Sequence, residues 1–133
     1  MDIDLPAAVR HDGYFTLMVV GQRDYDDAYE LDDALDRFYD AAEQRGLRLE
    51  LLRGDMMGAS TIAGDWAASR HVTCHSEHVD QDDPRREERL RAILARYQPD
   101  LCLMVPPSTA ASMMADLCRA TGIPVVHLDE LQR

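Results

Sequence analysis

The sequence predicts an α/β fold: a three-layer Rossmann-like domain whose five-stranded parallel sheet, in the order 3-2-1-4-5, carries helices on both faces. The first observation behind this prediction is the uncharged run from Phe15 to Val20, which ends at Gly21 and leads into a long amphipathic segment. A continuous apolar run of this length is typical of a strand buried in a parallel sheet. The second observation is the strict alternation of strand-like and helix-like segments with short connections, which favours right-handed crossovers.

The first helix is expected at Asp26–Arg45, directly after the first strand and its turn. Its apolar residues recur at helical spacing, and Gly46 is well placed to end it. This stripe consists of Ala28, Leu31, Leu35, Phe38 and Ala42. The opposite face is acidic, and it is either a surface exposed to solvent or a surface that docks a partner. The second strand is expected at Leu47–Leu52, where leucines supply the apolar content.

The second helix is expected at Ala59–Ser69, after a loop that contains two glycines. Its inward-facing residues are Ile62, Ala63, Trp66 and Ala67. The third strand is expected at Val72–Ser76, and the third helix at Pro84–Tyr97, where proline suits the first helical turn. The buried stripe of this helix consists of Leu90, Ile93, Leu94 and Tyr97.

The last unit consists of a strand at Leu101–Val105, a helix at Thr109–Thr121 that Gly122 ends, and a strand at Pro124–His127. The helix is expected to bury Met113, Met114 and Leu117. A single domain over residues 15–130 follows, with an N-terminal arm at 1–14 and a tail at 131–133. A short apolar patch at residues 5–9 of the arm would pack on the sheet edge or on a second subunit.

The composition narrows the classes of function. The formal net charge of −11 disfavours general nucleic-acid binding, because phosphates need a basic protein face. All 14 basic residues are arginine, so an anion site must use guanidinium groups or backbone N–H groups. No segment approaches the ~18 apolar residues of a membrane span, and the acidic start does not resemble a signal peptide. A cytoplasmic protein with reduced cysteines is expected.

Three connections are predicted to form one ligand site. In a sheet of this order the winding reverses between the first and fourth strands, and ligands of open α/β sheets bind at the carboxyl ends of the strands there. The connection Gly21–Tyr25 follows the first strand, Arg53–Gly58 follows the second, and Pro106–Thr109 follows the fourth. The helix that begins after the fourth strand offers unpaired N–H groups to an anion.

The same connections carry a resemblance to a known family. The segments VVGQRDYDD, LLRGDMMGASTIAGDWA, RREERLRAIL and PDLCLMVPPSTAASMM follow one another in a characteristic order. Together they resemble the SLOG superfamily, the Smf/DprA–LOG Rossmann-like fold, and in particular its YspA-like branch, over residues 15–130. This resemblance implies a nucleotide-type ligand, either an ADP-ribose- or NAD-derived molecule or a nucleoside monophosphate.

The resemblance and the loop positions together give a set of expected ligand-binding residues. They are Gly21, Gln22, Arg23, Tyr25, Gly54, Asp55, Gly58, Ala59, Ser60, Arg86, Arg89, Pro106, Ser108 and Thr109. Arg23 would bind a phosphate through its guanidinium group, and Arg86 or Arg89 would reach in from the third helix. Alternatively, Arg23 pairs with Asp24 or Asp55, and the two hydroxyl residues Ser108 and Thr109 only cap the fourth helix.

Three functional hypotheses remain open from the sequence. The first is a small SLOG-type sensor or binding domain. The second is a LOG-like N-glycosidase acting on nucleoside 5′-monophosphates, with Asp24 or Asp55 as the acid–base. It is less favoured, because Met114 stands near the position of the family's catalytic glutamate. The third is an interaction protein with a degenerate pocket, assembled as a homo-oligomer through the methionine-rich fourth helix or the arm.

A separate cluster raises the question of a metal site. His71, Cys74, His75 and His78 lie close together in the sequence, and imidazole and thiolate are ligands that zinc prefers. In an extended strand, however, His71 and His75 point to the opposite face from Cys74 and His78. The four side chains cannot converge without a bend, so we expect no metal here and a partly exposed strand end instead.

Overall fold

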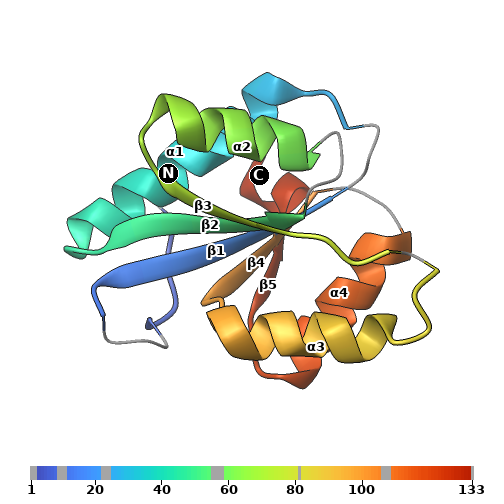
Figure 1. The fold of residues 1–133 in the computed structure, drawn as a ribbon. Helices are drawn as coiled ribbons and strands as arrows, with labels where there is room; N and C mark the ends of the chain where they lie inside the picture. The colour runs from blue at the N-terminus through green and yellow to red at the C-terminus, as the bar shows by residue number, and fades with distance from the viewer. Residues whose placement is uncertain are drawn as a thin grey trace.

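The computed structural model describes residues 3–8, 12–21, 25–54, 59–80, 82–105 and 109–132 of the chain (Figure 1). Its five strands form one parallel sheet in the order β3-β2-β1-β4-β5, which confirms the predicted topology. The strands are β1 (Tyr14–Val20), β2 (Arg48–Gly54), β3 (Thr73–Glu77), β4 (Leu101–Met104) and β5 (Val125–His127). The helices are α1 (Ala28–Gln44), α2 (Ala59–Ser69), α3 (Arg86–Tyr97) and α4 (Thr109–Ala120).

The sheet is the middle of three layers, with α1 and α2 on one face and α3 and α4 on the other (Figure 1). Strand β1 is buried on both faces because alternate side chains enter two different cores. Phe15, Leu17 and Val19 pack with α1 and α2, whereas Met18 packs with α3 and α4. The uncharged run that the sequence singled out is therefore the central strand of the fold.

Local signals account for the helix boundaries. The Asp27 carboxylate accepts a hydrogen bond from the Glu30 N–H at 3.0 Å and so caps the first turn of α1. Gly46, with φ of +72°, ends the same helix in the left-handed conformation that glycine adopts without strain. The third helix begins two residues later than the sequence predicts, because the Asp83 side chain accepts from the Arg85 N–H at 2.8 Å before the helix starts.

Two terminal segments pack on the core of α1 and α2. Leu5 of the arm is 5% exposed within this core and Ala8 packs against it, so these two residues of the apolar patch contact their own chain. A 3-10 helix, η1 (Leu128–Gln132), follows β5, and the sequence pattern did not predict it. Its first residue, Leu128, is fully buried, and the Leu131 carbonyl accepts from Arg37 Nη1 at 3.0 Å.

Two predicted core positions are wrong. Met113 is 41% exposed, because the inward stripe of α4 runs through Met114, Leu117 and Cys118 and leaves Met113 beside it. Ala28 is exposed in the first turn of α1. No helix in the described parts of the chain has the length and apolarity that crossing a membrane requires.

Candidate functional site

Three chain segments meet at Gly21, at the carboxyl ends of the strands. A Cβ atom added to Gly21 would lie 2.7 Å from Val105 Cβ and 2.8 Å from Ala59 Cβ. Gly21 directly follows β1, Val105 directly follows β4, and Ala59 begins α2. Only a glycine allows so close an approach. The residues that flank the three predicted loops are thus brought together where the winding of the sheet reverses.

Many of the predicted site residues lie outside the described residues. These are Gln22, Arg23, Asp55, Gly58, Pro106 and Ser108, together with the catalytic candidate Asp24. Gly54 is the last residue of β2 and Thr109 the first of α4, so the backbones of both lie at the carboxyl edge of the sheet. Figure 1 shows the helices beginning at this edge, toward which the strand arrows point.

Tyr25 is held in place by the first turn of α1 and by the core beneath it. Its hydroxyl donates to Glu30 Oε1 at 2.6 Å, and its ring packs against the core of α1 and α2. Burial raises the pKa of the Tyr25 phenol far above its ordinary value, and the hydrogen bond to Glu30 raises it further. The hydroxyl therefore stays protonated and holds the chain before α1.

The first turn of α2 is tightly packed. Ala59 is 1% exposed and Ser60 is 8% exposed. The Ser60 carbonyl accepts a hydrogen bond from Arg53 Nη1 at 3.2 Å. Sequence reasoning did not single out Arg53, although a signal was present. In a strand every second residue faces the same side, so Arg53 lies on the same face as the buried Leu49 and Leu51, where a charged residue is unusual.

The two arginines predicted from α3 differ in their partners. Arg89 Nε lies 2.8 Å from Asp83 Oδ2, so a carboxylate already neutralises its charge. Arg86 is half-buried and donates from Nη1 to the Met113 thioether at 3.4 Å. Its Nε is buried without a hydrogen-bond partner, and no carboxylate of the described residues lies within 4.0 Å of its guanidinium. Arg86 is therefore the arginine of α3 that remains available to an anion.

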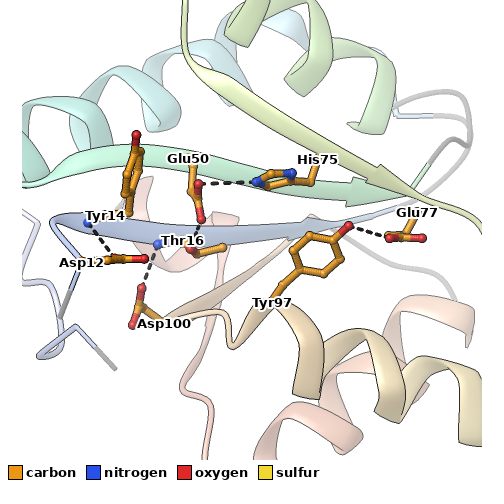
Figure 2. A network of polar contacts seen from close by, with 8 residues as sticks. All are labelled: Asp12, Tyr14, Thr16, Glu50, His75, Glu77, Tyr97 and Asp100. Atoms are coloured by element: carbon orange, nitrogen blue, oxygen red, sulfur yellow. Dashed lines mark hydrogen bonds and ion pairs between the residues drawn. The ribbon is translucent and has the colours of Figure 1, made fainter. Parts of the chain in front are cut away.

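A polar network crosses the sheet on the side of α3 and α4 (Figure 2). Thr16 of β1 is fully buried, and its hydroxyl donates to Glu50 Oε1 at 2.7 Å. The other carboxylate oxygen of Glu50 lies 3.4 Å from Nε2 of His75 on β3. The Tyr97 ring centroid lies 5.0 Å from that of His75, and the Tyr97 hydroxyl donates to Glu77 at 2.6 Å. The network joins β1, β2 and β3 to the end of α3.

Asp100 completes this network at the start of β4. Its carboxylate accepts from the Thr16 N–H at 2.8 Å, and its own N–H donates to the Thr16 carbonyl at 2.8 Å. Regular pairing of β1 with β4 begins only at Leu17 and Leu101. The Asp100 side chain thus extends the pairing by one residue. Sequence reasoning missed the network, because Glu50 stands within a leucine-rich strand and only its neighbours explain its burial.

The histidine and cysteine cluster is dispersed in the structure. His75 lies beside Glu50, and His78 Nε2 lies 2.7 Å from Asp80 Oδ1. Cys74 packs with the core of α1 and α2, on the opposite face from His75, and His71 lies in the turn after α2. Within the described ranges no three His, Cys, Asp or Glu side chains are grouped so as to hold a metal ion.

A cavity of about 290 Å³ lies at the other end of the sheet, between the ends of α3 and α4. Leu94, Pro99 and Ile123 contribute to its mainly apolar lining. It is remote from Gly21, because the ends of these helices lie opposite the carboxyl edge of the strands (Figure 1). This cavity is not part of the predicted crevice.

Comparison with known proteins gives a distant likeness among solved structures. No family model and no curated protein matches the chain. Among solved structures, the chain is similar to the C-terminal domain of a hydrogenase from Pyrococcus furiosus, with 15% sequence identity and a TM-score of 0.48. The match covers 92% of this chain and 98% of that chain.

Proposed function

We propose that this protein is a small SLOG-type binding domain that holds a nucleotide or nucleotide-derived ligand at the carboxyl ends of β1 and β4. The observation that carries the proposal is the meeting of Gly21, Ala59 and Val105 at one point. Ligands of open α/β sheets bind where the strand order reverses, and here the flanks of three loops converge at that place. A glycine there allows a ligand to approach the backbone closely.

A local positive charge supports an anionic ligand, although the overall charge of the protein is negative. The chain carries 25 acidic and 14 basic residues, so its overall field repels anions, and attraction must come from local groups. Arg86 is such a group, because its half-buried guanidinium has no carboxylate partner among the described side chains. A buried guanidinium cannot lose its proton, so a phosphate would stabilise it. Arg23, as the resemblance implies, would supply a second guanidinium.

Thermal unfolding with nucleotide ligands tests the proposal. A ligand at one hundred times its dissociation constant stabilises the folded state by about 2.7 kcal/mol, which gives a clear rise in Tm. We expect such a rise with AMP, ADP-ribose, NAD or a cyclic nucleotide. No rise with any of them at millimolar concentration would contradict the proposal and favour an interaction protein with a degenerate pocket.

Two arginine variants from the same helix sharpen the test. Arg86→Gln should weaken the affinity for the ligand about tenfold or more, because a charged hydrogen bond is worth about 1.5–3 kcal/mol. Arg91→Gln removes the same charge from an exposed residue that pairs with Glu87 at 3.1 Å, and affinity should stay within about twofold. An equal loss of affinity in both variants would show that the net charge of the protein determines binding, and it would contradict the role assigned to Arg86.

We also propose that the protein is cytoplasmic and assembles as a homo-oligomer. Two large apolar side chains are exposed in the described parts of the chain, Tyr29 in the first turn of α1 and Met113 in α4. Exposed aromatic and methionine side chains are enriched at protein interfaces. Light scattering after size-exclusion chromatography tests assembly, and a mass of 15.0 kDa would identify a monomer and contradict this part of the proposal.

A further inference from the structure

Arg53 lies in a narrow space between α2 and the edge strand β3. It is the second-last residue of β2, and in the sheet it pairs with Ser76. Its Nη1 donates to the Ser60 carbonyl at 3.2 Å, and the nearby guanidinium counteracts the rise that burial causes in the pKa of the Cys74 thiol. Its Nε is buried without a hydrogen-bond partner. The described surroundings thus offer this cation a carbonyl and a thiol, which are both neutral.

Gly64 of α2 leaves the room that this guanidinium occupies. A Cβ atom added to Gly64 would lie 2.8 Å from Arg53 Cζ and 2.9 Å from its Nε. Any larger residue would therefore push the guanidinium out of its position. Glycine weakens a helix interior by roughly 1 kcal/mol relative to alanine, so a packing reason for it is expected, and contact with Arg53 supplies one.

The charge of Arg53 has no counterpart in the described part of the chain. No carboxylate there lies within 4.0 Å of its guanidinium, although the protein has 25 acidic residues. By contrast, the exposed Arg70, which directly follows α2, pairs with the Asp36 carboxylate at 2.7 Å. An unneutralised cation that is half-buried is costly, and a guanidinium cannot relieve that cost by losing its proton.

We infer that Arg53 is the centre of an oxyanion site between α2 and β3, which takes a phosphate-like group. Half-buried Cys74 and exposed Ser76 lie on the same face of β3 as Arg53 lies on β2, so both can contribute to the site. The site adjoins the place where Ala59 meets Gly21, because Ala59 directly precedes Ser60. It does not depend on nucleotide binding, since an inorganic anion would satisfy the guanidinium.

Calorimetric titration of the full chain with inorganic phosphate, at constant ionic strength, tests this inference. Wild-type protein should show saturable binding, and Arg53→Gln should weaken it at least about tenfold. Arg48→Gln is the matched control, because it removes the same charge from an exposed residue of the same strand. The affinity of this variant for phosphate should stay within about twofold of the wild-type value. Gly64→Ala should weaken binding while keeping Arg53 in the sequence.

Alkylation of Cys74 in the wild-type protein gives a readout that needs no variant. Burial raises the pKa of the Cys74 thiol, and the Arg53 guanidinium counteracts this rise. Phosphate on Arg53 should therefore slow iodoacetamide labelling of Cys74 at pH 8, as followed by peptide mass spectrometry, while chloride should not. Absence of saturable phosphate binding, wild-type affinity in Arg53→Gln, or an unchanged labelling rate would each overturn the inference. None of these results bears on nucleotide binding, which the thermal-unfolding test decides separately.

Discussion

Replacing Asp100 tests whether the polar network stabilises the sheet. Asp100 is 1% exposed, and its carboxylate accepts the N–H of Thr16, which is fully buried. In Asp100→Ala this N–H loses its acceptor at a place that water does not reach. The start of β1 would then lack the side-chain contact that precedes its pairing with β4 at Leu17 and Leu101.

The magnitude is worked from the bond between the Asp100 carboxylate and the Thr16 N–H. A hydrogen bond to a charged group contributes about 1.5–3 kcal/mol, and a buried donor left without an acceptor costs about 1–3 kcal/mol. Because these two quantities describe the same loss, we expect Asp100→Ala to lower the free energy of unfolding by about 2–3 kcal/mol. For a chain of 133 residues this corresponds to a fall in Tm of roughly 6–12 °C.

Urea unfolding followed by circular dichroism measures this change. Asp100→Asn keeps an acceptor oxygen and should lose clearly less stability than Asp100→Ala. Asp116→Ala is the surface control, because its carboxylate is 78% exposed and pairs with Arg119 at 3.4 Å; it should change stability by less than about 0.5 kcal/mol. If Asp100→Ala also falls within this limit, the proposed role of Asp100 is refuted.

Two further perturbations test the site and the network. Gly21→Ala should destabilise the fold by about 1–3 kcal/mol, since its Cβ would lie 2.7 Å from Val105 Cβ; unchanged urea unfolding would contradict the close approach. The hydrogen bond to Glu77 raises the pKa of the Tyr97 phenol in the folded state above its ordinary value of about 10. The hydrogen-bonded phenol therefore contributes its full stabilisation below about pH 10, and this contribution is lost as the pH rises through the pKa of the folded state. Tyr97→Phe should therefore lose less stability between pH 9 and pH 11 than wild type, and an equal loss would contradict this.

The sequence by itself determined the type and order of the strands and α-helices. The uncharged run at Phe15–Val20 predicted the central strand, and helical spacing predicted all four helices, with α2 at the bounds observed. Gly46 and Gly122, which follow α1 and α4, adopt the left-handed φ values of helix-ending glycines. These signals are local, so they can be interpreted without knowing which segments become neighbours. The parallel topology then followed from the general handedness of crossovers.

Only the tertiary structure decided which polar groups are buried together and which charges are neutralised. Asp100 and Thr16 are 84 positions apart, yet their hydrogen bond spans 2.8 Å. Arg53 and Arg86 resemble the other arginines in the sequence, and packing alone separates them from the carboxylates of the described residues. Gly21 resembles any glycine after a strand until Val105 and Ala59 are placed against it. Hydrogen bonds, ion pairs and close contacts act over a few ångströms, so they are decided by which distant segments the fold brings together.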